Sequence, residues 1–337
     1  APELGLEERP GGWAVELRHV VGKIIKPAVF HQAAQVLDAG ARDHQHQARD
    51  VAEDDALLLS EFGAEERAED VVVELKDAVE QPFLLEREGQ LYLRDGEKRP
   101  WLNDDLQSFT PLRFMPPELM DYSGRAVVMD PDIFAVGDIR ELLSRDMGGK
   151  ALMCRAKSGS KGRRGALASS VMLLDCARLK HWSMARQFGE MFTFERDYMD
   201  WISLKLEDRS TIGLFEDCWN DFDHLDENTK LLHNTKRKTQ PWKTGLPVDY
   251  RPADTFRLFP PRHWIRRTRR ALFGDYKFAG TYKRHPDPNQ ERFFFGLLKE
   301  CLESGIVDEA RIEEEMRRNH IRHDALRILE ATPPLAA

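Results

Sequence analysis

Short apolar runs separated by polar turns recur through the middle of the chain. Each run is about as long as a buried strand and ends in polar or turn-forming residues, so we predict strands there. The predicted strands cover residues 125–129, 151–154, 169–175, 212–215 and 231–232. Several are apolar throughout, which is typical of a strand that is buried on both faces.

Helices are predicted in the intervals between these strands, at residues 139–145, 179–188 and 193–206. Asp138, with Glu141 three residues later, makes an acidic version of a capping box at the start of the first helix. Strands that alternate with helices indicate an α/β protein with a mixed sheet flanked by helices.

The residues just before the first strand carry weaker signals. Residues 83–85 and 90–93 predict strands or a hairpin, with a turn at 95–96 where Asp precedes Gly. Thr110 followed by Pro111 predicts the start of a helix that carries Arg113 in its first turn.

The two ends of the chain differ from the middle. Residues 1–80 hold 18 acidic and 8 basic residues, and the only strand predicted there is 71–75. No complete strand, turn and helix unit is found in this acidic segment, so we hypothesise that part of it is non-native or disordered sequence. Recovery of peptides from residues 1–60 of the endogenous protein would refute a non-native origin.

The C-terminal part, 251–330, is predicted to be a basic linker followed by helices at 293–304 and 308–319. Residues 262–284 hold eight basic residues and one acid, interleaved with aromatic residues. Three interpretations remain open for them: peripheral contact with an anionic membrane, polyanion binding, or an ordinary surface. Residues 82–250, between these two parts, form the predicted α/β core.

Composition narrows the class of protein. The chain has 337 residues, of which 41% are hydrophobic, and a formal net charge of −8, which disfavours a nucleic-acid partner. Its four scattered cysteines predict neither a zinc ribbon nor a disulfide framework. No apolar run reaches membrane-spanning length, and we expect a cytoplasmic protein that works at most at the inner face of the membrane.

A pair of carboxylates follows the first central strand. Asp130 and Asp132 flank Pro131, and alternate residues of an extended chain point the same way, so the two oxygen donors suit Mn²⁺ or Mg²⁺. Because proline cannot donate to a ladder, we expect the pair at an exposed sheet edge. The competing interpretation is a polar turn without a metal.

A histidine about a hundred residues downstream supports the metal interpretation. His233 ends a short apolar run and is followed by Lys236, Arg237 and Lys238 without an intervening acid. An imidazole nitrogen completes a set of donors for Mn²⁺, and nearby cations would neutralise a diphosphate. A packed or capping histidine is the alternative.

The order of these motifs resembles the retaining family 8 glycosyltransferases of GT-A fold, which have a Rossmann-type mixed sheet. The resemblance covers roughly residues 106–245. It rests on an arginine-bearing helix at Arg113, the Asp130-Pro131-Asp132 motif with a following Gly-Asp, the 169–175 strand, a Trp-Asn turn at 219–220, and His233 followed by a basic group and Pro-Trp at 241–242.

The resemblance implies a glycosyltransferase that moves a sugar from a nucleotide sugar, first of all a UDP-sugar, to a carbohydrate or lipid-linked hydroxyl acceptor. Asp130, Asp132 and His233 would hold Mn²⁺. The residues implied to contact the donor are Arg113, Lys236, Arg237, Lys238 and Trp242. Asp197 and Asp200 are loose counterparts of the family's Asp-Gln-Asp motif and are the further catalytic candidates.

The expected pathway is polysaccharide or glycolipid synthesis. The alternatives are a catalytically inactive or truncated relative, and a polyanion- or membrane-binding module that uses residues 262–284.

Overall fold

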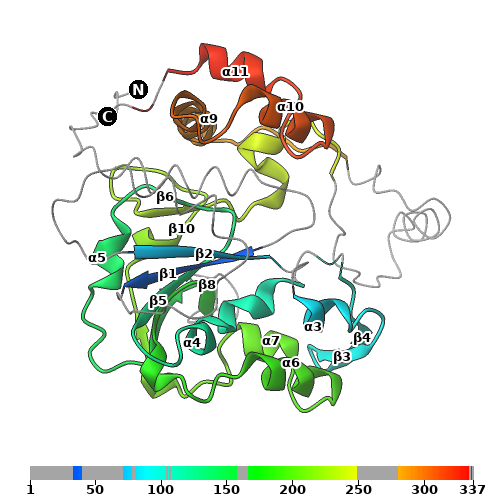
Figure 1. Ribbon diagram of the computed structural model, residues 1–337, viewed down its shortest axis with the longest axis vertical. Helices are drawn as coiled ribbons and strands as arrows, with labels where there is room; N and C mark the ends of the chain where they lie inside the picture. The colour runs from blue at the N-terminus through cyan, green and yellow to red at the C-terminus, as the bar shows by residue number, and fades with distance from the viewer. Residues whose placement is uncertain are drawn as a thin grey trace.

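We describe a computed structural model of the chain, covering residues 33–39, 71–77, 81–103, 105, 108–157, 166–248, 280–333 and 335. A six-stranded sheet lies at its centre (Figure 1). Its strands, in order across the sheet, are β2 (Val71–Asp77), β1 (Ala33–Ala39), β5 (Arg125–Met129), β8 (Leu167–Asp175), β7 (Leu152–Ala156) and β9 (Ile212–Leu214). Neighbouring strands are antiparallel except β7 and β9, which are parallel. The sheet is therefore mixed, as expected.

The central strand β5 is buried on both faces. Ala126 and Val128 pack into one hydrophobic cluster, whereas Val127 and Met129 pack into another on the opposite face. This alternation follows from the pleat of an extended chain. The next residue of the first set is Asp130, which therefore continues toward the face of Ala126 and Val128.

One face of the sheet is covered by short helices and a hairpin, seen in the lower half of Figure 1. They are α3 (Pro82–Leu85), the hairpin β3 (Leu91–Arg94) and β4 (Glu97–Pro100), the 3₁₀ helix η2 (Thr110–Phe114), α4 (Pro116–Leu119), η3 (Cys176–Arg178), α6 (Met184–Phe192) and α7 (Tyr198–Ile202). Phe114, Trp182 and Trp201 are completely or almost completely buried here, and Phe114 stacks on Trp201 with ring centroids 4.8 Å apart.

Several elements differ from the sequence prediction. Residues 83–85 lie in helix α3, not in a strand, whereas the hairpin with its turn at 95–96 is confirmed. The helix predicted at 193–206 is reduced to α7, and the one predicted at 179–188 begins later, as α6. Thr110 lies inside η2 and does not cap it.

The opposite face carries α5 (Ile139–Leu143) and a small three-stranded sheet. That sheet contains β10 (Asp221–Phe222), β11 (Leu231–His233) and β6 (Ile133–Ala135), in that order. Strands β10 and β11 are parallel, whereas β11 and β6 are antiparallel. The other 3₁₀ helices among the described residues are η4 (Arg209–Thr211), η5 (Asp217–Asn220), η6 (Arg237–Thr239) and η7 (Pro241–Lys243).

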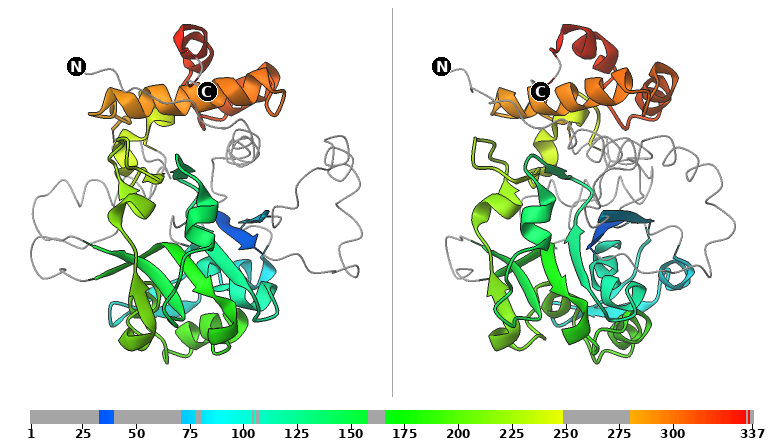
Figure 2. Two further views of the ribbon diagram at one scale, coloured as in Figure 1. Left: turned by 90° about the vertical axis from the view of Figure 1, so that its left-hand side faces the viewer. Right: turned by 60° about the vertical axis from the view of Figure 1, so that its left-hand side comes forward.

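The C-terminal helices cover the outer side of the small sheet (Figure 2). They are α9 (Pro288–Glu303), α10 (Glu309–Arg317) and α11 (Ala325–Ala331), so both predicted C-terminal helices are present and a third follows. Phe134 of β6 and Leu232 of β11 belong to the same buried cluster as Phe294 and Leu298 of α9. The small sheet is thus packed between the main sheet and these helices.

The upstream part of the sheet has an unexpected direction. Strands β1 and β2 pair antiparallel with each other, and β1 is antiparallel to β5. A nucleoside-holding unit of the Rossmann type would instead place parallel strands there, joined by a helix.

Among the described helices, none combines the length and the hydrophobicity needed to cross a bilayer. Nearly all of the basic stretch 262–284 lies outside the described residues.

Candidate metal centre

Asp130 lies just beyond the end of β5 and is held by Arg113. The Nε of Arg113 donates to Oδ1 of Asp130 over 2.7 Å, and one terminal nitrogen of Arg113 donates to Oδ2. The other terminal nitrogen donates to the hydroxyl of Ser169 over 2.9 Å. A guanidinium that grips both carboxylate oxygens fixes the orientation of Asp130 and neutralises its charge.

This carboxylate is buried, so our expectation of an exposed sheet edge is wrong for Asp130. Its side chain is 8% exposed, and β5 has a neighbouring strand on each side. Pro131 is compatible with this position because it stands after the last ladder residue of β5, where no backbone donor is required.

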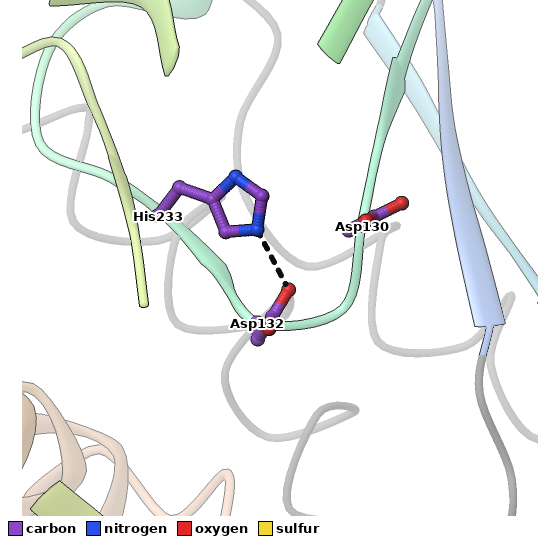
Figure 3. A group of neighbouring side chains, drawn as sticks. All are labelled: Asp130, Asp132 and His233. Atoms are coloured by element: carbon purple, nitrogen blue, oxygen red, sulfur yellow. Dashed lines mark ion pairs between the residues drawn. The ribbon is translucent and has the colours of Figure 1, made fainter. Parts of the chain in front are cut away.

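Asp132 and His233 are brought together by the small sheet. In the β6–β11 ladder His233 is paired with Ile133, the residue after Asp132, and the backbone N–H of Asn234 donates to the carbonyl of Asp132 over 3.2 Å. Nε2 of His233 consequently lies 3.4 Å from Oδ1 of Asp132 (Figure 3). The register of one short strand pair thus joins residues that are about a hundred positions apart in sequence.

Together the three side chains form a set of metal donors. One ligand atom from each of Asp130, Asp132 and His233 can be chosen such that all lie within 4.8 Å of one another. Arg113 cancels one carboxylate charge, which leaves about one net negative charge at the cluster when the imidazole is neutral. Two carboxylates and an imidazole are suitable donors for Mn²⁺, so the residues present fit the implied cation.

The two carboxylates have different environments. Burial raises the pKa of Asp130, although the charge of Arg113 opposes that shift. Burial acts in the same direction on Asp132, but the charge that His233 carries when its imidazole is protonated, and the hydrogen bond that Nε2–H then donates, prevail and hold the pKa of Asp132 below its usual range. Asp132, with a side chain that is 29% exposed, is the more accessible anion of the two.

Asn220 and the neighbouring serines of β8 were not among our predicted site residues. Asn220 is fully buried and contacts His233, while Ser169 contacts Arg113. The signal for the serines was present in the sequence, because 169–170 is a polar pair inside an apolar strand. Arg155 similarly interrupts the apolar run of β7, and it proves to brace the segment that carries Asn220.

The remaining predicted residues do not join the metal-donor set. Asp197 caps α7, accepting from the backbone N–H groups of Met199 and Asp200, and it also accepts from the N–H of Gly96 over 2.8 Å. The carboxylate of Asp200 pairs with exposed Lys205. These contacts give both residues local structural roles, and a catalytic role for them stays a prediction.

The cations after His233 lie at the surface, whereas the tryptophan does not. Lys236, Arg237 and Lys238 are exposed, and the backbone N–H of Lys236 donates to Asp223 over 3.0 Å. Trp242 is 9% exposed and packs on Phe294 with ring centroids 5.2 Å apart. It serves as a core contact for the C-terminal helices, which leaves little of its ring for a ligand.

A second group of potential donors lies in β10 and the loop that follows it. It consists of Asp221, His224 and Asp226. Asp226 accepts from the backbone of the following turn, and Asp221 accepts from His224 and from the hydroxyl of Thr229. The side chain of His224 is 61% exposed. Hydrogen bonds within the loop account for these contacts without a metal.

Comparison with known proteins finds structural similarity over part of the chain only. No protein-family model matches the chain, and no curated protein matches it. The glycosyltransferase GlyE of Streptococcus pneumoniae TIGR4 is similar over 40% of this chain and 38% of its own, with 17% identity and a TM-score of 0.33. Mouse xyloside xylosyltransferase 1 is similar over 47% of this chain and 72% of its own, with 14% identity and a TM-score of 0.32. This chain thus spans about two fifths of the first structure.

Proposed function

We propose that this protein is a metal-dependent glycosyltransferase that uses a nucleotide sugar, with a UDP-sugar as the first donor to test. The observation that carries the proposal is the convergence of Asp130 and Asp132, from the connection between β5 and β6, with His233 of β11. The order of the surrounding motifs along the chain, which resembles retaining family 8 enzymes, supports the same assignment.

The residues at this site have distinct tasks. Asp132 and His233 would provide the accessible donors for Mn²⁺, while Asp130 would contribute an oxygen that Arg113 holds in place. A cation bound there supplies Lewis-acid stabilisation of the negative charge on a departing nucleoside diphosphate. The exposed cations at 236–238 would attract the diphosphate electrostatically.

In this proposal the sugar of the nucleotide sugar is transferred, with retention of its anomeric configuration, to a hydroxyl of a carbohydrate or of a lipid-linked acceptor. The pathway would be polysaccharide or glycolipid synthesis. We place the enzyme in the cytoplasm, with contact to the inner membrane face through 262–284 as a further part of the proposal. The stretch 262–284 could alternatively bind a polyanion.

A second candidate function is a catalytically inactive relative of such enzymes. The antiparallel pairing of β1 with β5 favours it, because a parallel strand and helix unit would normally form the nucleoside pocket. Calorimetry with UDP and Mn²⁺ separates the two candidates. Binding supports the enzyme, whereas absence of heat at millimolar UDP supports the inactive relative.

The decisive variant is Asp132→Asn. We expect it to abolish Mn²⁺-dependent hydrolysis or transfer from a UDP-sugar, because it removes the accessible carboxylate. Asp130→Asn is less informative, since it also leaves the buried Arg113 without its anion.

Asp175→Asn is a matched control for the same chemical change. Asp175 ends β8, is 30% exposed in its side chain and pairs with Arg178 outside the metal-donor set. Asp175→Asn should retain activity. Equal activity of the wild type and Asp132→Asn would contradict the proposal.

A further inference from the structure

We infer that Asn220 positions His233, holding the imidazole in the tautomer that has its proton on Nδ1 and an unprotonated Nε2 facing Asp132. The inference rests on the proposed metal-dependent function, since it states how this chain prepares one of its cation donors. Asn220 is a positioning residue because it acts through His233.

The contact is buried and specific. Asn220 is 0% exposed, and its Oδ1 lies 2.8 Å from Nδ1 of His233. Its Nδ2 donates to the hydroxyl of Ser170 over 3.0 Å. An amide oxygen only accepts hydrogen bonds, so in this orientation Nδ1 of His233 must carry the proton. In the neutral imidazole the lone pair is then on Nε2, the nitrogen that lies 3.4 Å from Asp132.

The opposite amide orientation would reverse this outcome. If the NH₂ group of Asn220 faced His233, Nδ1 would have to accept, and Nε2–H would point toward Asp132. That tautomer cannot bind a cation through Nε2. The direction of one amide therefore decides whether His233 is a ligand, which makes Asn220 a testable determinant of the site.

Arg155 fixes the backbone that carries this amide. One of its terminal nitrogens donates to the carbonyl of Asn220, and the other donates to Asp217 over 2.9 Å. The guanidinium lies 4.2 Å from the ring centroid of Phe222, and that ring contacts the imidazole of His233 edge-on with centroids 5.4 Å apart. Arg155 thus supports both the amide and the aromatic wall beside the imidazole.

Ser170 connects the amide to the first carboxylate. Its carbonyl accepts from the backbone N–H of Asp130 over 3.0 Å, while its hydroxyl accepts from Asn220. The preceding residue, Ser169, points to the other face of β8 and contacts Arg113. Strand β8 therefore positions two of the proposed metal ligands: Asp130 directly, and His233 through Asn220. Hydrogen-bond partners of this kind typically change metal affinity by about 10- to 100-fold when removed.

Two measurements at about pH 8 test the inference. The first is the tautomer of His233 in metal-free protein, read from long-range ¹H–¹⁵N correlations and assigned by their loss in His233→Gln. The second is the dissociation constant of Mn²⁺, read from the paramagnetic resonance of the free ion. The wild type should show the Nδ1–H tautomer and bind Mn²⁺.

Asn220→Leu should weaken Mn²⁺ binding about 10- to 100-fold and allow the Nε2–H tautomer. Asn220→Asp should preserve both the affinity and the tautomer, because a carboxylate still accepts from Nδ1–H and Ser170 can rotate its hydroxyl to donate. Asn103→Leu is the control: Asn103 also uses both ends of its amide, toward Trp101 and the carbonyl of Leu85, outside the metal-donor set. It should leave Mn²⁺ binding unchanged.

An Nε2–H tautomer in the wild type would overturn the inference. So would Asn220→Leu with wild-type Mn²⁺ affinity. If the wild type fails to bind Mn²⁺, the proposed metal-dependent function fails, whereas the tautomer measured in metal-free protein still decides whether Asn220 positions His233.

Discussion

The Arg113–Asp130 pair offers the sharpest test of how the site is built. Replacing Arg113 with Met removes the guanidinium and leaves a buried carboxylate without its counter-charge. The two side chains are only 11% and 8% exposed, so solvent compensates little. Breaking a buried pair from one side typically costs about 3–5 kcal/mol of unfolding free energy. That cost lowers the folding equilibrium constant by roughly two to three and a half orders of magnitude.

The double variant Arg113→Met, Asp130→Leu removes both charges and should recover most of this loss. Ser169 does not become an orphan in either variant, because its hydroxyl still donates to the carbonyl of Ile202. Urea denaturation followed by circular dichroism measures each variant, and the double-mutant cycle gives the coupling. A loss below about 1 kcal/mol in Arg113→Met, or a double variant that is no more stable than the single one, would refute this account.

The remaining predictions concern thiols, pH and the C-terminal helices. Burial raises the pKa of Cys154 to about 12, so iodoacetamide at neutral pH should modify the half-buried Cys218 before Cys154, as peptide mass spectrometry would show. The hydrogen bond that His224 donates to the carboxylate of Asp221 raises the pKa of His224 above its usual value of about 6.5. Its stabilisation is therefore fully present below pH 6.5 and lost as pH rises through the folded-state pKa, so His224→Gln should lower the urea midpoint at low pH but not at high pH. Trp242→Ala should cost about 3–5 kcal/mol and speed proteolysis of the C-terminal helices; unchanged cleavage would contradict its packing role.

The central strands could be predicted because burial on both faces produces uninterrupted apolar runs. The helix predicted at 193–206 could not be divided correctly from sequence. Phe194 and Leu204 adopt positive φ angles of 65° and 58°, just beyond the ends of α6 and α7. Such left-handed residues commonly terminate helices, but glycine or asparagine usually marks them. Leu204 is buried in the hydrophobic cluster on this face of the sheet, and the ring of Phe194 contacts Lys98. Neither contact can be read from the local sequence.

The cluster of Asp130, Asp132 and His233 was predictable in identity but not in environment. The order of the motifs along the chain predicts its members. The burial of Asp130 is possible because Arg113 neutralises the carboxylate, whereas the sequence analysis assigned Arg113 to contact with the nucleotide sugar. The capping role of Asp197 follows from its place directly before α7, a common position for aspartate. Asn220 could not be assigned a partner, because its contact with His233 depends on strand register and not on spacing in sequence.

The antiparallel pair β6–β11 serves two parts of the molecule at once. Phe134 and Leu232 face the C-terminal helices, whereas Ile133 and His233, the adjacent pair in the same ladder, face the main sheet. A shift of the β6–β11 register by one residue would exchange these faces. It would move the imidazole of His233 away from Asp132 and, at the same time, Leu232 away from the C-terminal helices. Selection on either function therefore constrains the other: a substitution accepted for helix packing must also preserve the donor geometry, and the two cannot evolve independently.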